Sequence, residues 1–415
     1  MFGHCLCFKF GTKTILNKRK ILIVSTYDSK YGAGIAAQNL HYEFRRRNLI
    51  SNLLVLHKLG SSQNVCTLNL PFFFEKLKKF LWGLDRILLK FFKNSSISWS
   101  FGFVGFDITK CKLFKEADII IICWVQGGFI SIKNLSKIFN SNKKIVWRFS
   151  DMWPLTAGCH YSLGCEKFQL ECKNCHLIRN DYLNIIINKV YKYKKIILSN
   201  KRFKIMTPSN WLRDQVNKSV YYKNIETINI GTFTNDEIFR YNDNNILRSK
   251  IGIQPNKFTI LVGSVDLSDS RKGFNYALKA FDRLDFDFTV LTYGKVCNIK
   301  LKNTSFINLG YIDKKEKLAE IYNIADVFLA PYLYDNLPNT IIESLSCGTP
   351  VVAFDTCGIP ELITHRNTGY LAKSFEVDSL VDGLKWAKEF VKPKVSLLPE
   401  NFTKDIVMER IIHFI

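Results

Sequence analysis

Short apolar runs rich in β-branched residues alternate with helix-like stretches along most of the chain, and this alternation restricts the fold more than any other feature. One series begins with KILIVST (20–26) and contains ADIIIICWV (117–125). A second series begins with FTILVGS (258–264) and reaches PVVAFD (350–355). Such alternation is typical of parallel sheets that helices cover on both faces. The sequence therefore predicts two doubly wound α/β domains.

The length of the chain, 415 residues, also favours two hydrophobic cores over one. A polar, Asn-rich stretch around residues 228–256 separates the two series and is the expected hinge. We expect an N-terminal domain at residues 1–232 and a C-terminal domain at 233–390. Residues 391–415 are expected to form a C-terminal helix that packs back on the N-terminal domain.

The composition favours a cytoplasmic protein with anionic partners. The apolar run at 117–125 is far too short to span a bilayer, and residues 1–20 lack the apolar centre of a signal peptide. The 12 cysteines are then expected to be reduced thiols. A net charge of +23 favours nucleotide phosphates, acidic lipids or nucleic acid as partners, although a Lys-, Asn- and Ile-rich composition can raise the charge without any partner.

A basic amphipathic helix is expected at EKLKKFLWGLDRILLKFFKN (75–94), where apolar residues follow a helical stripe and Lys and Arg lie mainly off it. One interpretation is peripheral contact with an anionic membrane at the inner face of the cytoplasmic membrane. The other is a helix that packs on its own domain.

The stretch DNLPNTIIESLSCGTPVVAFDTCGIPE (335–361) places an acid before a helix and a second acid inside it. Glu343, one turn into the helix, can accept hydrogen bonds from paired sugar hydroxyls, and Asp335 can accept from another sugar. The helix start should present backbone amides to a phosphate. Its expected residues are Leu337, Pro338 in the first turn, Asn339, Thr340 and Ile341. The alternative is a dipole-stabilising acid and a surface glutamate.

Adjacent cations follow the strand at 258–264, since Arg271 and Lys272 precede Gly273 and a helix. Paired cations beside a strand end suit a diphosphate, and the alternative is a solvated pair on a basic protein. Near the N-terminus, Gly32 and Gly34 are expected to flank a turn into a helix, which would leave amides open to a phosphate or a sugar. Small glycine clusters of this kind are also common in ordinary strand–helix turns.

The run VWRFSDMWPLTAGCHYSLGCEKFQLECKNCHLI (146–178) combines a strand end with a cysteine cluster. Asp151 is a candidate for orienting an acceptor hydroxyl, or alternatively a turn or helix-cap acid. Four cysteines within the expected loop 158–176 have the spacing C-x5-C-x6-C-x2-C and suit a structural zinc ion: Cys159, Cys165, Cys172 and Cys175. Reduced cysteines without a metal are the alternative.

The C-terminal half resembles the retaining glycosyltransferases of family 4, which have two facing Rossmann-like domains (the GT-B fold). The resemblance rests on RKG (271–273) and on the stretch 335–361. It implies that Arg271 and Lys272 bind the donor diphosphate, that Glu343 holds the donor ribose and that Asp335 addresses the donor sugar. The backbone at Tyr311 and Ile312 would frame the nucleobase, and Gly263 would line the nucleotide site.

The run at 146–178 is similar to one in a subgroup of that family that builds bacterial surface polysaccharides of the colanic acid, capsule or O-antigen type. Three positions depart from the family pattern: Ser150 replaces a His, Asp335 replaces a Glu and Cys357 replaces a Gly. The resemblance implies a transferase that moves a sugar from a UDP- or GDP-sugar to a glycan or lipid-linked oligosaccharide, with no metal in catalysis and no nucleic acid partner. The alternatives are a sugar-nucleotide epimerase of the same fold, a zinc-containing nucleic-acid-binding protein and a non-catalytic sugar-binding relic.

Overall fold

The computed structural model describes residues 19–415 except 30, 61, 63, 69–97, 179–180, 199–201, 244, 255 and 296–304. The amphipathic helix expected at 75–94 lies outside the described residues. The chain separates into two compact units, each built on a sheet whose registered strand pairs are all parallel. The N-terminal unit runs to Ile230 and includes Met408–Ile415, and the C-terminal unit is Gly231–Val407. The prediction of two parallel-sheet α/β domains is thus confirmed.

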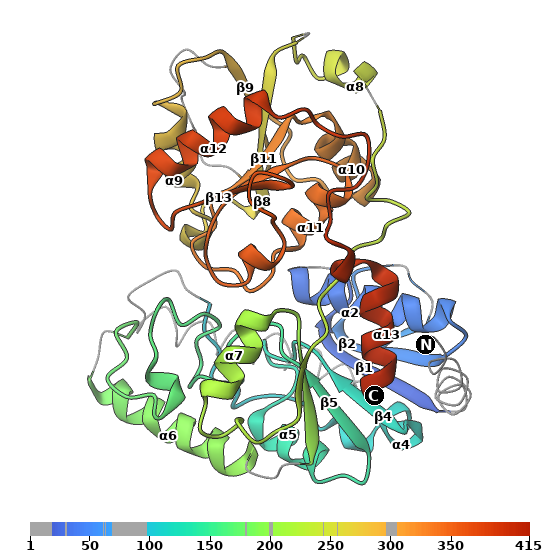
Figure 1. The fold of residues 1–415 in the computed structure, drawn as a ribbon. Coiled ribbons are helices and arrows are strands. Elements are labelled where there is room, and N and C mark those ends of the chain that lie inside the picture. Colours follow the sequence, from blue (N-terminus) through green and yellow to red (C-terminus); the bar gives the residue numbers. More distant parts are fainter. Residues whose placement is uncertain are drawn as a thin grey trace, which may run out of the picture. The chain divides into compact units, whose positions relative to one another are not determined.

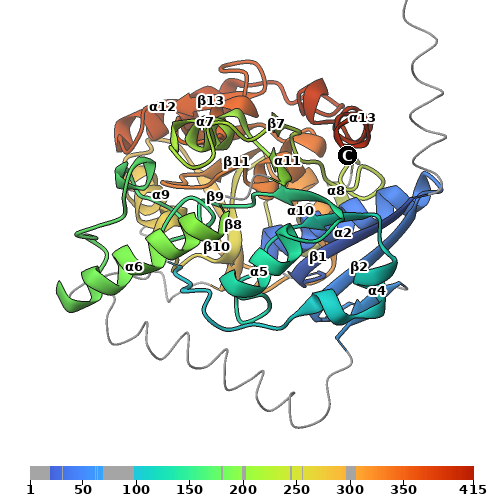
Figure 2. The ribbon, with the colours of Figure 1, turned by 90° about the horizontal axis from the view of Figure 1, so that it is seen from below.

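The N-terminal unit holds a seven-stranded sheet with the order β3-β2-β1-β4-β5-β6-β7. Its strands are β1 (Lys20–Tyr27), β2 (Ile50–His57), β3 (Val65–Thr67), β4 (Ile119–Ile122), β5 (Lys144–Arg148), β6 (Phe203–Thr207) and β7 (Thr227–Asn229). Its helices are α2 (Tyr31–Arg46), α4 (Lys112–Glu116), α5 (Ile132–Phe139), α6 (Asp181–Leu198) and α7 (Asn210–Lys218). Helix α2 runs along β1 and β2 (Figure 2). A side chain at Gly34 would begin 3.0 Å from the Tyr27 carbonyl oxygen, so this glycine permits the close packing of α2 on β1.

The C-terminal unit holds a six-stranded sheet with the order β10-β9-β8-β11-β12-β13. Its strands are β8 (Phe258–Asp266), β9 (Phe288–Lys295), β10 (Ser305–Asn308), β11 (Val327–Ala330), β12 (Val351–Phe354) and β13 (Gly369–Ala372). Its helices are α8 (Asn245–Lys250), α9 (Phe274–Phe281), α10 (Lys315–Ile324), α11 (Asn339–Ser346) and α12 (Val377–Glu389).

Two hydrophobic clusters cover the two faces of this second sheet. Successive residues of a strand point to opposite faces, so Leu261 packs in the cluster that contains α10 and α11, and Ile260 packs in the cluster that contains α9 and α12. The same helix pairs lie on opposite sides of the sheet in the ribbon (Figure 1). The continuous apolar runs in the sequence therefore correspond to strands that are buried on both faces.

The C-terminal segment differs from the prediction. Residues 391–407 belong to the C-terminal unit, so the expectation that all of 391–415 packs on the N-terminal domain is wrong for this part. Lys392 Nζ donates to Thr349 Oγ1 (2.7 Å), and the Leu397 amide donates to the Leu345 carbonyl (2.7 Å). Only the end of α13 (Lys404–Phe414) joins the N-terminal unit, where Lys144 Nζ donates to the Ile415 carbonyl (2.8 Å). Within the described part of the chain, every helix is too short or too polar to cross a bilayer.

Candidate functional site

The strand order of the C-terminal unit reverses between β8 and β11, which pair with each other in parallel. In open α/β sheets, ligands bind beyond the carboxyl ends of the strands at such a reversal. The loops that follow these two strands carry Arg271, Lys272 and Asp335. They are tied together where the Leu333 amide donates to the Arg271 carbonyl (2.8 Å). The predicted donor residues therefore stand at the position where this fold class binds ligands.

Lys272 and Asp335 form an ion pair across the two loops. Lys272 Nζ lies 2.7 Å from Asp335 Oδ2, and their side chains are only 16% and 14% exposed. The ammonium group also lies 3.9 Å from the centre of the Tyr332 ring. Burial lowers the pKa of Lys272, but the charge and hydrogen bond of Asp335 together with the nearby Tyr332 outweigh burial, so that the net shift of the pKa is upward. Arg271 is bound separately, by the carboxylate of Asp269.

A left-handed backbone at Gly273 sets the position of both cations. Gly273 has φ 65°, and a Cβ there would overlap the Pro331 carbonyl oxygen at the end of β11. Only glycine adopts this conformation in such close contact without strain. The RKG sequence therefore places Arg271 and Lys272 in a short 3-10 turn directly against the loop that carries Asp335.

Tyr332 connects Lys272 to helix α11. Its hydroxyl donates to the Gly263 carbonyl of β8 (3.0 Å) and lies 2.9 Å from Thr340 Oγ1 of α11. Sequence reasoning missed Tyr332, although its place just after the apolar strand β11 is a signal that an aromatic residue borders the site.

Glu343 is buried in the second turn of α11 with 7% exposure, and its Oε2 accepts a hydrogen bond from the Tyr322 hydroxyl (3.2 Å). The Tyr322 hydroxyl in turn lies 2.7 Å from that of Tyr293. Burial raises the pKa of Glu343 to about 7, against the opposing effects of the Tyr322 hydrogen bond and of Lys315. Glu343 is thus a carboxyl group whose charge changes near neutral pH, which excludes the alternative of an ordinary surface glutamate.

The start of α11 differs from the prediction in two respects. Pro338 is the capping residue before the helix, with φ −73° and ψ 122°, and the helix itself begins at Asn339. The Ile341 amide donates to the Pro338 carbonyl (3.1 Å), so the expectation that this amide is open to a phosphate is wrong. Leu337 is buried, 7% exposed, against the core of the unit.

The roles expected of Gly263 and Tyr311 beside the nucleotide are not established by their surroundings. A Cβ at Gly263 would overlap the Tyr293 ring, so the structure explains this glycine by core packing. Tyr311 and Ile312 follow β10, in a loop anchored where the Gly294 amide donates to the Gly310 carbonyl (2.8 Å). Tyr311 is 65% exposed. Their role beside a nucleobase stays a prediction.

Asp151 follows β5 in the N-terminal unit and is only 7% exposed. Its Oδ1 accepts from the Trp153 amide (2.8 Å). Its Oδ2 accepts from His160 Nδ1 (2.6 Å) and from Trp124 Nε1 (2.9 Å). His160 Nε2 lies 3.1 Å from Ser100 Oγ. These contacts fix the neighbours of Asp151, as a turn acid would. Because Oδ1 accepts from the described residues only one of the two hydrogen bonds that it can accept, the role of Asp151 toward an acceptor hydroxyl stays a prediction.

Gly32 and Gly34 do not flank a turn. Both lie within the first turn of α2, which begins at Tyr31, so this part of the sequence prediction is wrong. Gly34 allows this first turn to approach Tyr27, at the end of β1, closely.

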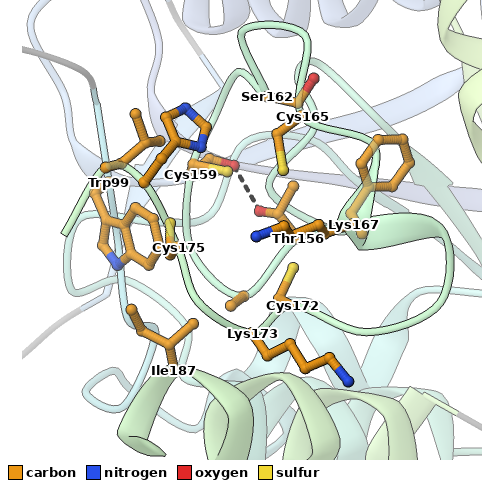
Figure 3. A pocket seen from close by; sticks show the side chains of 14 residues that line it. Trp99, Thr156, Cys159, Ser162, Cys165, Lys167, Cys172, Lys173, Cys175 and Ile187 are labelled. Atoms are coloured by element: carbon orange, nitrogen blue, oxygen red, sulfur yellow. Dashed lines mark hydrogen bonds between the residues drawn. The ribbon is translucent and has the colours of Figure 1, made fainter. Parts of the chain in front are cut away.

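The four predicted zinc ligands line one pocket of the N-terminal unit, together with Trp99 and Lys167 (Figure 3). Burial raises the pKa of the Cys172 thiol to about 12, and it also raises that of Cys159. Across the described residues, however, no three Cys, His, Asp or Glu side chains are grouped so that they could hold a metal ion. The residues share a pocket but do not fit a metal site in their present arrangement, and zinc stays a prediction.

Two of the family departures have structural consequences. Cys357 has φ 51°, a left-handed conformation that favours glycine. Ser150 is partly buried, and its Oγ accepts a hydrogen bond from Arg148 Nη1 (3.2 Å).

Comparisons with known proteins show which sequences and folds this chain resembles. Residues 257–387 match the family model described as Glycosyl transferases group 1. A glycosyltransferase of Haemophilus influenzae is 23% identical over 67% of this chain and 70% of its own length. A protein of Escherichia coli named for colanic acid biosynthesis, the glycosyl transferase WcaC, is 22% identical over 84% of this chain and 86% of its own.

Solved structures share the fold over nearly the whole chain. Sucrose-phosphate synthase from Thermosynechococcus elongatus has a TM-score of 0.61 at 15% identity and covers 96% of this chain and 98% of its own. Anabaena HepE in complex with UDP-glucose has a TM-score of 0.60 at 15% identity and covers 95% and 99%. The two parallel-sheet α/β domains therefore match GT-B glycosyltransferase structures, and the sequence is related to group 1 glycosyltransferases and to enzymes of polysaccharide biosynthesis.

Proposed function

We propose that this protein is a retaining, family 4 glycosyltransferase that moves a sugar from a UDP- or GDP-sugar to a glycan or lipid-linked oligosaccharide of a surface polysaccharide. The observation that carries the proposal is the cluster at the β8–β11 reversal. There the pair Lys272–Asp335 contacts Tyr332, and Tyr332 reaches α11, the helix that bears Glu343. Relatives support the substrate class, since one is named for colanic acid biosynthesis and HepE was solved with UDP-glucose.

In this proposal Arg271 and Lys272 bind the donor diphosphate, and Glu343 accepts from the ribose hydroxyls. The bond between the sugar C1 and the phosphate oxygen breaks, and a bond from C1 to the acceptor oxygen forms on the same face. The acceptor proton passes to the leaving phosphate oxygen. The two cations stabilise the charge on the departing diphosphate, a contribution of about 3 kcal/mol for a well-placed group. The chain's own residues thus supply the electrostatic stabilisation without a divalent metal.

The N-terminal unit is proposed to bind the acceptor. Asp151 acts there through its neighbours: it holds Trp124 and His160 at the carboxyl ends of β4 and β5. We also propose that the reaction takes place at the inner face of the cytoplasmic membrane, because a net charge of +23 favours anionic lipid surfaces. Co-sedimentation with anionic but not with neutral vesicles tests this location.

The double variant Arg271→Ala/Lys272→Ala tests the proposed reaction. Nucleotide sugars are first screened by thermal shift, and products with lipid-linked acceptors are then identified by mass spectrometry. We expect transfer to fall more than ~100-fold, from the loss of charge stabilisation. Lys385→Ala, which removes an exposed cation of the same unit, is the control and should retain activity. Near-normal turnover of the folded double variant would exclude this diphosphate site, and product formed from donor alone would favour the epimerase.

A further inference from the structure

Both cations of the proposed diphosphate site already have acidic partners, but the two pairs differ. Arg271 is paired with Asp269, two residues away, and the Asp269 carboxylate also accepts from the Arg271 amide (3.0 Å). This acid is therefore part of the local turn. Lys272 is paired with Asp335, 63 residues away on the loop after a different strand. The second acid is thus brought to the site by the fold and not by local chain geometry.

Asp335 already binds Lys272, the cation that a diphosphate would need. At 2.7 Å the carboxylate oxygen takes one of the three N–H directions of the ammonium, and the Tyr332 ring covers another side at 3.9 Å. An incoming phosphate oxygen must share the remaining space with a carboxylate of like charge. Because both side chains are largely buried, solvent screens this repulsion only weakly.

We propose that Asp335 is a built-in competitor of the diphosphate: it holds Lys272 between turnovers, yields it to the donor and pairs with it again as the nucleoside diphosphate leaves. The inference rests on the proposed function and adds a role in product release. Once the leaving phosphate oxygen has lost to solvent the proton that it took from the acceptor, the product diphosphate carries one more negative charge than it did in the donor. The deprotonated product would therefore bind the cations more tightly than the donor did. Repulsion by Asp335 opposes that gain most strongly in the product state.

The test uses inorganic pyrophosphate, without sugar or nucleoside, as the titrant in calorimetry on the full chain. Asp335→Asn keeps the side-chain shape and removes the charge, and we expect it to bind pyrophosphate about tenfold more tightly than the wild type, a change of about 1.4 kcal/mol. Asp335→Ser should show the same tightening. Asp335→Glu retains the competing charge and should stay within about twofold of the wild type, which is well below one tenfold step.

Asp285→Asn is the matched control, because it removes one negative charge from the same unit at an exposed pair with Lys385 (2.9 Å). It should leave pyrophosphate binding unchanged. If Asp285→Asn binds pyrophosphate as much more tightly as Asp335→Asn does, the inference is overturned. It is also overturned if Asp335→Asn and Asp335→Ser both bind pyrophosphate no more tightly than the wild type does. If the wild type binds pyrophosphate and these variants gain nothing, the competitor role fails while the diphosphate site stands. If neither the wild type nor the variants bind, the proposed function fails together with the inference.

A purely structural role of Asp335 would give a different result. Loss of a purely structural ion pair would leave Lys272 buried without its partner and lower the stability of the protein, with no effect on the inhibition by product. In turnover assays, the competitor role further predicts that the nucleoside diphosphate product inhibits Asp335→Asn about tenfold more strongly than it inhibits the wild type. Equal product inhibition would contradict the role in release.

Discussion

Replacing Glu343 with glutamine should abolish a pH dependence of nucleotide binding that the wild-type protein shows. Burial raises the pKa of this carboxyl group from 4.5 to about 7, and its known partner, the Tyr322 hydroxyl, only partly offsets that effect. The proposed ribose contact requires the ionised form, because only that form offers both oxygens as acceptors to the paired hydroxyls. Nucleotide binding should therefore select the ionised fraction of the protein.

The size of the effect follows from that fraction. With a pKa of about 7, roughly nine-tenths of the molecules are ionised at pH 8 and one-tenth at pH 6. Since the apparent Kd scales inversely with the competent fraction, binding should weaken about tenfold from pH 8 to pH 6. Glu343→Gln should show a flat profile over this range. At pH 8 it should lose the charged hydrogen bonds, which contribute about 1.5–3 kcal/mol.

The contribution of Glu343 to the stability of the fold changes with pH in the opposite sense to nucleotide binding, because it falls as pH rises. Because the pKa in the folded state is raised, the folded protein holds a proton on Glu343 more tightly than the unfolded chain does. Stability from this group is present below about pH 4.5 and is lost as pH rises through about 7, a change of about 3 kcal/mol. Relative to the wild type, Glu343→Gln should therefore be more stable at pH 8 than at pH 5.

Calorimetric titration of UDP and of GDP at pH 6, 7 and 8 measures the first effect, and urea unfolding at pH 5 and 8 measures the second. Glu43→Gln is the control, since it replaces another buried glutamate, on α2 of the N-terminal unit. It should keep the pH slope of the wild type. If nucleotide affinity depends on pH as steeply in Glu343→Gln as in the wild type, the proton is not on Glu343. If Glu343→Gln binds nucleotide at pH 8 as tightly as the wild type does, the ribose contact is refuted.

Two further substitutions test the geometry of each unit. Gly273→Ala forces a side chain into a left-handed position against the Pro331 carbonyl, so it should destabilise the fold by about 2 kcal/mol or more in urea unfolding; a shift below about 0.5 kcal/mol would contradict the strain argument. Asp151→Asn replaces one accepting oxygen by an NH2 group that cannot accept from His160, Trp124 or the backbone, and should cost about 1–3 kcal/mol in the same assay. Wild-type stability of that variant would contradict the structural role of the acid.

Much of the fold could be predicted because the strands are buried on both faces. FTILVGS and PVVAFD are continuous apolar runs bounded by polar or turn residues, and they became β8 and β12 within two residues of the expected ends. The boundary between the two units near the C-terminus could not be predicted in this way. Residues 391–407 return to α11 through backbone and lysine contacts that leave no periodic pattern, so the sequence did not reveal which unit they join.

The candidate site could be predicted only as a set of residues. RKG and the two acids were visible in the sequence, but the pairing of Lys272 with Asp335 depends on β8 and β11 being neighbours in the sheet. The partners of Asp151 in the N-terminal unit could not be predicted from the sequence either. Its position after a strand suggested a role with substrate, whereas three N–H donors from Trp153, His160 and Trp124 use its oxygens. Trp153 and His160 lie within the run 146–178, but the sequence spacing does not show that they and Trp124 all donate to Asp151.

Core packing at Gly263 affects the hydrogen bonds that reach Glu343, the acid proposed to bind the ribose. The sequence suggested that this glycine lines the nucleotide site, but in the structure the Tyr293 ring lies where a side chain at 263 would begin. That ring places the Tyr293 hydroxyl 2.7 Å from Tyr322, which donates to Glu343. Gly263→Ala should displace Tyr293, weaken this chain of hydrogen bonds and change the pH midpoint of nucleotide binding without touching the nucleotide. Titration of UDP and GDP against pH tests this; a variant that folds and keeps the wild-type midpoint would show that Glu343 is set by its own burial alone.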